Sequence, residues 1–338
     1  MNQVTLAQVA EEAGVHESTV SRALNPETES LVNSKTLKRV KAAAARLNYV
    51  PNVVARGLRT KFSKTIGVII PDLTNPIFPE IIRGIERHLA PLGYTSLITD
   101  VHGSPSLESS TVESLTQRQV DGFIIATGVE DRSIVDYLER SNLPVVLVNR
   151  GAEGKRYTLV SGNDEDGVRS TVNHLNDLGH RSMLHLAGPN SHTTSRGRAK
   201  ALRAACDEAG IRLTLLEAKE LTVVEGERLT DFALDTMSGE FTAIQASTDL
   251  LALGSLRSIR KFGLNCPDDI SVSGFNDMPF AEEFSPGLTT VRVPLEEIGK
   301  ESARQLMRSL ADKKMTPIVV SLPVELVIRA STGPAKSS

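Results

Sequence analysis

Residues 5–24 read TLAQVAEEAGVHESTVSRAL, and the rest of the interpretation depends on this stretch. Its first apolar residues recur with the i, i+3, i+4, i+7 spacing of one helix face: Leu6, Val9, Ala10 and Ala13. Thr5 stands where a helix N-cap is expected, and Gly14 follows the last apolar position, as at helix ends that adopt a left-handed conformation. The stretch therefore predicts a short helix followed by a tight turn.

Two more helices are predicted after this turn. One runs roughly from Glu17 to Leu24, and its inward residues are Val20, Ala23 and Leu24. The other runs roughly from Lys35 to Leu47, with Asn33 or Ser34 as its cap and an inward face of Leu37, Val40, Ala44 and Leu47. Two short helices across a tight turn, supported by a third, indicate a helix-turn-helix domain over residues 1–49.

The charge of the chain is divided unevenly along its length. All 338 residues together carry a formal net charge of -3. Residues 1–64 hold ten basic and five acidic residues, a net +5, whereas the other 274 hold 28 basic and 36 acidic residues, a net −8. Between Glu29 and Asp72 there are nine basic residues and no acidic one, a pattern typical of a surface that follows nucleic-acid phosphates.

Residues 50–62 are expected to connect this head to the rest of the chain. After Pro51 the sequence NVVARGLRT is long enough for about two helical turns, and it contains Gly57, which disfavours a helix. Isolated helices shorter than about 12 residues are marginal in water, so this one should form only when something packs against it. We therefore interpret the segment as a conditional hinge helix.

From Thr65 onward, short Val- and Ile-rich runs alternate with helical segments. Eight runs predict strands, at residues 65–73, 94–101, 120–128, 143–150, 181–188, 213–221, 241–248 and 270–276. The predicted helices lie near Pro76–Leu92, Pro105–Arg118, Asp131–Ser141, Gly167–Leu178, Ser195–Ala209, Glu225–Met237 and Asp249–Phe262. About nine strands exceed one compact unit. We therefore expect an α/β core of two doubly wound parallel sheets, with a ligand cleft between two lobes at the carboxyl ends of the strands.

Taken in order, these motifs resemble the lactose/galactose repressor (LacI/GalR) family of bacterial transcription regulators. The resemblance rests on TLAQVAEEAGVHESTVSRALN, LNYVPNVVARGLR, TIGVIIPDLTNPIF and ISVSGFNDMPFAEEFSPGLTTV, and it extends from about residue 4 to about residue 330. It implies a core similar to periplasmic sugar-binding proteins over residues 63–338. The lobes would then be discontinuous, crossing near Val160, Thr290 and Leu322, with an N-lobe of about 63–160 and 291–322 and a C-lobe of about 161–290 and 323–332.

The resemblance also implies a set of contacts to double-stranded operator DNA. These residues are Thr5, Glu17, Ser18, Thr19, Ser21, Arg22, Asn33, Thr36, Tyr49, Asn52, Ala55, Leu58 and Arg59. Arg22 suits a bidentate contact to guanine; the alternative is an arginine that is simply solvated on the protein surface. Glu17 either accepts from a cytosine amino group or compensates the helix dipole. Leu58 matches a wedge that enters the minor groove, or else packs the hinge. His16 departs from the family's usual Ser or Thr, which leaves the helix cap open.

For the effector, the family's pocket positions fall just after the predicted strands. They are Asn75, Ile77, Phe78, Asn149, Arg150, His192, Thr194, Arg196, Arg198, Gln245, Thr248, Phe275 and Asn276. Arg198 is the strongest single candidate, because its family counterpart grips effector oxygens, and Phe78 offers an aromatic face. Members that bind neutral sugars often have aspartates in place of Asn149 and Asn276. We therefore predict a sugar or sugar-derived effector that is anionic, such as a sugar acid, a phosphorylated sugar or another small carboxylate. The alternative is a neutral cleft, in which Arg150 or Arg196 pairs with Asp164, Asp249 or Asp277.

The expected protein is a cytoplasmic regulator, usually a repressor in this family, that binds a palindromic operator as a homodimer. The N-terminus lacks the pattern of a signal peptide, no run of about 18 apolar residues occurs, and Cys206 and Cys266 have no partner at metal-ligand spacing. No cofactor, metal or membrane partner is expected, and no catalytic motif indicates an enzyme. The alternative function is a solute-binding protein without a DNA role. The C-terminal RASTGPAKSS lacks leucine heptads, so a dimer is preferred to a tetramer.

Overall fold

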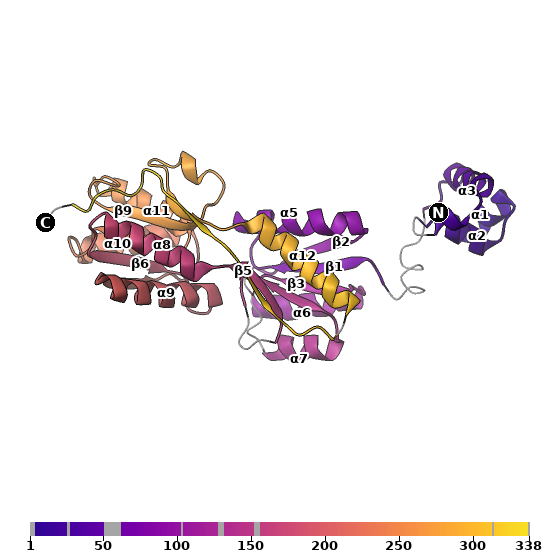
Figure 1. Cartoon of the computed structure of the whole chain (residues 1–338), viewed down its shortest axis with the longest axis horizontal. Coiled ribbons are helices and arrows are strands. Elements are labelled where there is room, and N and C mark those ends of the chain that lie inside the picture. The colour runs from indigo at the N-terminus through magenta and orange to yellow at the C-terminus, as the bar shows by residue number, and fades with distance from the viewer. Residues whose placement is uncertain are drawn as a thin grey trace. The chain divides into compact units, whose positions relative to one another are not determined.

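The computed structural model describes residues 4–25, 28–50, 62–102, 104–127, 132–151, 156–312 and 314–336. The chain forms two compact units, Met1–Ser63 and Lys64–Ser338, which we call the head and the core unit. Figure 1 labels the helices and strands of both. Among the described residues, no helix has the length and apolarity needed to cross a membrane.

The described residues of the head form three α-helices and one short 3-10 turn. These are α1 (Leu6–Ala13), α2 (Glu17–Ala23), η1 (Glu29–Leu31) and α3 (Ser34–Arg46). Thr5 caps α1 in a capping box with Gln8, and Gly14 ends the helix at φ 58°, a left-handed conformation that favours glycine. The three predicted helices are confirmed to within a residue or two. Their buried faces meet in one small apolar cluster that includes Val9, Val20 and Val40.

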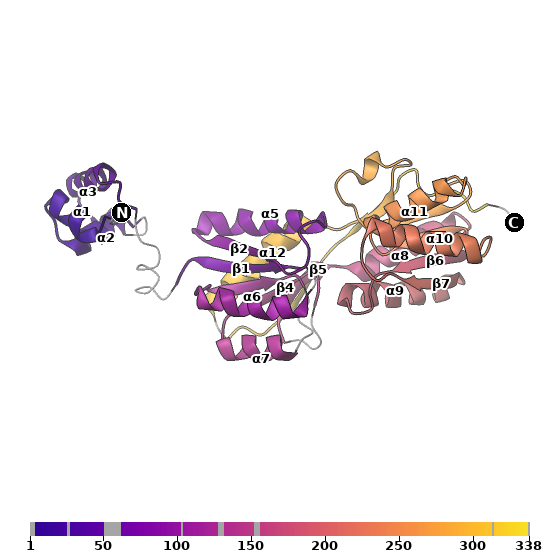
Figure 2. The same ribbon diagram turned by 180° about the vertical axis from the view of Figure 1, so that it is seen from behind.

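The N-lobe of the core unit contains a six-stranded parallel sheet in the order β11-β5-β4-β3-β1-β2. Its strands are β1 (Thr65–Ile70), β2 (Thr95–Asp100), β3 (Gly122–Ile125), β4 (Val145–Val148), β5 (Thr158–Gly162) and β11 (Val319–Leu322). Its helices are α5 (Ile77–Leu89), η2 (Ala90–Leu92), α6 (Pro105–Gln117), α7 (Arg132–Ser141) and α12 (Leu295–Ala311). Figure 2 shows α5 and α12 on one face of the sheet and α6 and α7 on the other.

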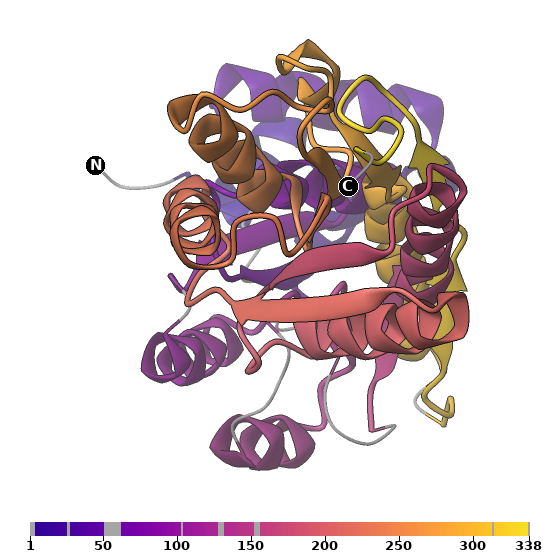
Figure 3. The ribbon, with the colours of Figure 1, turned by 90° about the vertical axis from the view of Figure 1, so that its left-hand side faces the viewer.

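The C-lobe repeats this architecture with the strand order β12-β10-β9-β8-β6-β7. Its strands are β6 (Ser182–Ala187), β7 (Arg212–Glu217), β8 (Ala243–Ala246), β9 (Ser271–Asn276), β10 (Thr289–Arg292) and β12 (Glu325–Val327). Its helices are α8 (Asp164–Asp177), α9 (Thr193–Ala209), α10 (Val223–Thr236), α11 (Asp249–Lys261) and η3 (Ala281–Glu283). Figure 3 shows the two helix layers, α8 with α9 and α10 with α11, on either side of this sheet.

The chain passes between the lobes three times. It crosses after Gly162 at the end of β5, after Arg292 at the end of β10, and after Leu322 at the end of β11. Because β5 ends at Gly162 and β10 ends at Arg292, the first two crossings lie about two residues beyond the lobe boundaries proposed from the sequence. Every element that follows a crossing pairs or packs in the opposite lobe.

Two features of the core differ from the sequence prediction. The predicted α/β fold of two parallel sheets is confirmed, except that at one edge β12 runs antiparallel to β10, with Thr290 opposite Val327. The structure also contains α12 and the strands β5, β10, β11 and β12, which no predicted element represents. These strands are three to five residues long, and runs this short lack a periodicity that distinguishes strand from loop.

Candidate nucleic-acid interface and effector site

Helix α2 presents one polar face to solvent. Glu17, Ser18 and Arg22 are exposed, and Thr19 and Ser21 are half-buried, while the remaining positions hold the helix against the head's core. Ser18 and Arg22 lie four residues apart and therefore share a face. This is the arrangement by which a recognition helix presents its N-terminal half and one later side chain to base edges.

His16 caps α2 with its imidazole ring. Its Nδ1 accepts a hydrogen bond from the backbone N–H of Ser18 at 3.2 Å and lies 2.8 Å from Ser18 Oγ. The cap that the sequence left open is therefore made by histidine in place of a hydroxyl residue.

The candidate phosphate contacts of the head lie largely at helix starts. Thr5 and Asn33 are exposed, and they are the caps of α1 and α3; Asn33 Oδ1 accepts from the N–H of Lys35 at 2.9 Å. Thr36 and Tyr49 are half-buried. The predicted hinge contacts, Asn52, Ala55, Leu58 and Arg59, lie outside the described residues.

Two of the head's carboxylates are neutralised within the head itself. Glu12 pairs with Arg46 at 2.8 Å, and Glu29 pairs with Lys41 at 2.6 Å. Both pairs are solvent-exposed, so they contribute little to stability. Because these two glutamates are paired, the remaining positive charges on α2 and α3 dominate the electrostatic potential around these helices.

In the N-lobe, the candidate effector residues follow β1 and β4. Asn75 Oδ1 accepts from the N–H of Ile77 at 3.3 Å at the start of α5. Ile77 and Phe78 are buried in the lobe's apolar core, so Phe78, only 1% exposed, presents no open ring face. Asn149 has φ 64°, a left-handed conformation that asparagine tolerates well, and the neighbouring Arg150 is buried.

The segment that follows β4 lies against the start of α9 in the other lobe. The backbone N–H of Gly151 donates to Thr193 Oγ1 at 3.1 Å. This hydrogen bond joins the lobes near His192, on which the positive charges of both Arg150 and Arg196 act. Thr194 lies on the same first turn of α9 and is half-buried. We call the residues around this junction the effector site.

The other C-lobe candidates lie at the carboxyl ends of β8 and β9. Gln245 is buried within β8 and Thr248 just after it, and Thr248 caps α11 by accepting from the N–H of Leu251. Phe275 and Asn276 are buried at the end of β9, and Asn276 has φ 116°. The structure thus brings the C-lobe candidates to one edge of one sheet, where ligands bind in open α/β folds.

Arg198 is held from three directions. Its Nε donates to Asp164 Oδ2 at 2.7 Å, and one terminal nitrogen donates to the carbonyl oxygen of Ser247 at 2.8 Å. Its guanidinium carbon lies 3.7 Å from the centroid of the Phe275 ring, within cation–π distance. Arg198 therefore acts as a positioning group between α8, β8 and β9, and its charge is balanced by Asp164.

The three carboxylates considered as partners for Arg150 and Arg196 are each engaged by another group. Asp164 binds Arg198. Asp277 binds Arg292 at 2.7 Å and Arg329 at 2.8 Å. Asp249 accepts from Thr290 Oγ1 at 2.5 Å and from the N–H of Met278 at 2.7 Å. Burial raises the pKa of Asp249 to about 6, and the nearby Asp277 acts in the same direction.

His192 is the titratable group at the centre of the effector site. Burial, together with the positive charges of Arg150 and Arg196, lowers its pKa to about 4. The ring is therefore neutral at pH 7. Its Nδ1 is buried without a hydrogen-bond partner among the described residues, which makes it available to a ligand.

The sequence analysis missed Thr193 and Ser247, which supply the contact between lobes and the carbonyl that holds Arg198. Each lies beside a predicted residue, Thr194 or Thr248, so the signal was present in the strand and helix ends. Which of two adjacent polar residues faces inward depends on the register of the strand and on the cap of the helix. Neither the register nor the cap can be predicted from the sequence at these positions.

Two family models match the chain. Residues 5–52 match the model for bacterial regulatory proteins of the lacI family, and residues 172–332 match a periplasmic binding protein-like domain. Among curated proteins, the chain is 33% identical to the HTH-type transcriptional repressor PurR of Photobacterium profundum, over 97% of this chain and 98% of the relative. It is 30% identical to the ribose operon repressor of Halalkalibacterium halodurans, over 99% and 98% of the two chains.

A solved structure is similar along nearly its whole length. The Lac repressor dimer bound to operator and the anti-inducer ONPF is similar with a TM-score of 0.89 and 31% identity, covering 98% of this chain and 100% of that one. The head, the two-lobed core and relatives above 30% identity along nearly the whole length lead to one conclusion. The chain belongs to the LacI family of bacterial regulatory proteins.

Proposed function

We propose that this protein is a cytoplasmic transcriptional repressor, rather than an enzyme, that binds a palindromic operator under the control of a small molecule bound between the lobes. The observation that carries the proposal is the exposed face of α2. Ser18 and Arg22 stand on a helix that His16 caps, in the same chain as a two-lobed ligand-binding core. The head is what separates this function from that of a solute-binding protein.

A homodimer follows from the proposed operator, because two half-sites need two heads. Strand β2 is the free edge of the N-lobe sheet, and it exposes the apolar side chain of Ile98. In the C-lobe, Val224 and Phe280 are 72% and 77% exposed. Exposed apolar side chains, Ile98 on a sheet edge, Val224 on α10 and Phe280 before η3, favour burial against a second copy. The C-terminal segment binds its own C-lobe, since the N–H of Ala335 donates to the carbonyl of Leu178 at 2.8 Å.

Replacing Arg22 by alanine is expected to weaken binding to the chain's own selected DNA fragments about 10- to 100-fold, because a bidentate contact to guanine discriminates by about 1–3 kcal/mol. Binding to a random duplex should change far less. The fragments are recovered by the full-length chain from a random pool, and affinities are measured by mobility shift at one salt concentration.

The control for this experiment is Arg169→Ala. Arg169 is an exposed helical arginine of the core that pairs with Asp166, and its loss should leave both affinities unchanged. An equal fall of specific and non-specific affinity for Arg22→Ala would make this arginine a phosphate contact. Failure of the full-length chain to enrich any sequence would contradict the DNA-binding function itself.

The effector that fits this site best is anionic. Arg150 comes from the N-lobe and Arg196 from the C-lobe, and both positive charges act on the neutral His192 between them. The charge of Arg198 is balanced by Asp164. A carboxylate or phosphate placed beside His192 would interact favourably with both arginines and would thereby stabilise one arrangement of the lobes over another.

An anionic effector should bind more tightly as the pH falls from 7.5 to 5.5. A negative charge beside His192 raises its pKa from about 4, so binding takes up a proton, and uptake strengthens binding as protons become more available. A thermal-shift screen with matched pairs, such as D-glucuronate with D-glucose and D-gluconate with D-glucitol, identifies a probe, and calorimetry then measures its affinity against pH. His192→Gln should abolish the pH dependence.

The same histidine limits the pH range of this test. Since the folded pKa of His192 lies below the unfolded value of about 6.5, protein stability falls as the pH drops from about 6.5 toward 4. Measurements therefore stay above pH 5.5. A preference for the neutral member of each pair that His192→Gln abolishes, and that therefore arises at the effector site, would contradict the anionic effector while leaving the DNA-binding function intact.

A further inference from the structure

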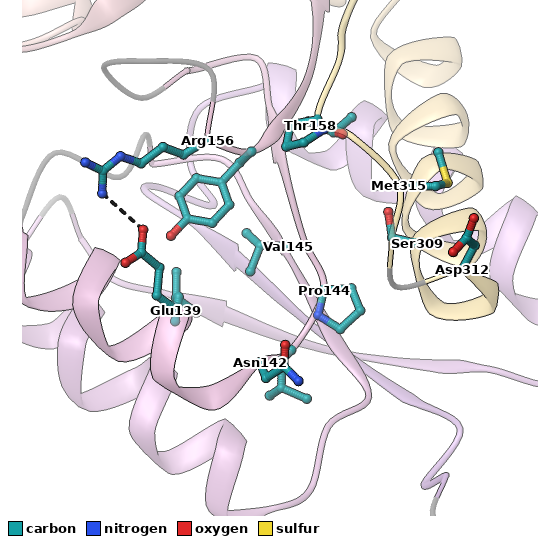
Figure 4. A pocket seen from close by; sticks show the side chains of 13 residues that line it. Glu139, Asn142, Pro144, Val145, Arg156, Thr158, Ser309, Asp312 and Met315 are labelled. Atoms are coloured by element: carbon teal, nitrogen blue, oxygen red, sulfur yellow. Dashed lines mark hydrogen bonds and ion pairs between the residues drawn. The ribbon is translucent and has the colours of Figure 1, made fainter.

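A cavity of about 220 Å³ opens at the amino ends of β4 and β5 in the N-lobe. Figure 4 shows Ser309 and Asp312 on the α12 side of it, and Glu139 and Arg156 on the opposite side. The effector site follows the carboxyl end of β4. The cavity therefore lies at the other edge of the same parallel sheet, and none of the predicted effector residues lines it.

The walls of the cavity come from the elements that connect the two lobes. Thr158 begins β5, which leads to the first crossing, and Ser309 lies near the end of α12, which follows the second. Pro317 precedes β11, which leads to the third crossing. Each of the three connections thus has its far end in the wall of this one cavity. A helix and two strands are rigid enough to carry a displacement from one end to the other.

The lining suits a small neutral molecule with several hydroxyl groups. Seven of the thirteen lining side chains are polar and six are apolar. Arg156 and Glu139 neutralise each other at 3.0 Å, so the walls offer no surplus positive charge for an anion. Asn142 both donates and accepts, and Asp312 accepts, which matches hydroxyl groups that do both. The volume lies below the usual range of about 300–1,000 Å³ for ligand pockets, which limits the ligand to about the size of a monosaccharide.

Tyr157 supplies a second, independent observation. It lines the cavity, and its Oη is buried without a hydrogen-bond partner among the described residues. Burial raises the pKa of this hydroxyl, with Glu139 acting in the same direction, so the hydroxyl stays protonated and is a donor. Buried donors in native proteins are nearly always satisfied. The Glu139–Arg156 ion pair on this wall is more than half exposed, so breaking it costs little free energy. When the pair separates, a ligand oxygen can reach the Tyr157 hydroxyl.

We propose that this cavity is a second small-molecule site, for a neutral polyol or monosaccharide, through which the arrangement of the lobes is regulated independently of the effector site. Binding itself does not depend on the proposed DNA function, whereas its effect on operator affinity does. The two sites differ in charge preference, since the effector site favours an anion and the cavity a neutral molecule.

The binding test uses ligand-observed saturation-transfer NMR on the full-length chain with D-glucose, D-ribose and D-mannitol. Ser309→Leu fills the cavity, and Ser170→Leu is its matched control. Both serines lie on helices and donate to the carbonyl four residues earlier, but Ser170 is exposed on α8. We expect at least one probe to bind wild type and Ser170→Leu with equal affinity, and to lose at least tenfold in Ser309→Leu. Tyr157→Phe should weaken the same probe without lowering the melting temperature of the unliganded chain.

Binding that is unaffected by Ser309→Leu, or the absence of binding for all three probes, would overturn the site. For the regulatory step, the saturating probe should change the affinity for the selected DNA fragment at least fivefold in wild type and not in Ser309→Leu, as expected for a typical coupling between two sites. A bound probe with no effect on DNA affinity would overturn the regulatory role alone. A chain that selects no DNA would instead contradict the proposed function and leave the binding result standing.

Discussion

Replacing Gly84 by alanine is expected to destabilise the core unit by about 3 kcal/mol, because helix α5 packs directly on the backbone of α12 at this point. A Cβ on Gly84 would lie 1.9 Å from the carbonyl oxygen of Glu296, and one on Gly299 would lie 2.0 Å from the carbonyl oxygen of Ile81. Both obstacles are main-chain atoms, so no side chain can rotate away. The two helices must separate, and the N-lobe loses close packing along the whole contact.

Urea unfolding of Gly84→Ala, Gly299→Ala and the wild type measures this effect. Gly197→Ala in α9 is the matched control, because a Cβ there meets nothing within 4 Å. Removing a flexible glycine from a helix should stabilise the protein by about 0.5–1 kcal/mol, the opposite sign. A loss below about 1 kcal/mol for Gly84→Ala would mean that α5 and α12 are not in backbone contact. Because α12 also walls the proposed second site, probe binding should weaken in the same variant.

Replacing Arg198 by methionine is expected to cost about 2 kcal/mol of stability. The substitution keeps much of the side-chain volume but leaves the Asp164 carboxylate and the Ser247 carbonyl without their donor. Breaking a buried pair costs about 3–5 kcal/mol, and Asp164 is 22% exposed at the start of α8, which reduces this. Lysine at the same position should restore little, because an ammonium neither stacks on Phe275 nor binds two acceptors in a fork.

The double variant Arg198→Met with Asp164→Asn tests the origin of this loss. If the cost comes from an uncompensated carboxylate, neutralising Asp164 should recover roughly half of it, and the double-mutant cycle should be clearly non-additive. Asp166→Asn is the control, since Asp166 lies on the same turn of α8 and pairs with the exposed Arg169. Additive losses in the first cycle would show that Arg198 acts through packing on Phe275 alone.

Local features of the chain were predictable at the level of single residues. Thr5, Gly14 and Asn33 end or begin helices of the head where the sequence places them. Most helices of the core were predicted within a few residues, because helix faces and caps depend on neighbours three or four positions apart. The His16 cap was not predictable, since histidine caps a helix only when its ring is turned toward the backbone.

The sequence predicted where along the strands and helices the candidate site residues lie, but not which groups each side chain contacts. The resemblance implied Arg198 and Phe78, yet the structure places Phe78 in the N-lobe core and engages Arg198 with Asp164 and Phe275. Two asparagines interpreted as lost carboxylates, Asn149 and Asn276, also occupy backbone conformations with positive φ. Polar residues at strand ends indicate that a site is near, but the direction of each side chain depends on the groups that surround it in the folded protein.

By itself, the sequence determined the three helices of the head, its excess of positive charge, and the alternation of strands and helices in the core. Each of these depends on residues close together in the chain. The family resemblance implied the three crossings to within about two residues, whereas only the tertiary structure decided the antiparallel edge strand β12, the place of α12 and the cavity at its end. These depend on contacts such as that between Arg87 and Glu296, which are 209 positions apart. The local pattern of apolar and polar residues carries no information on pairs so far apart in sequence. Whether two such residues come into contact depends on how all the intervening helices and strands pack.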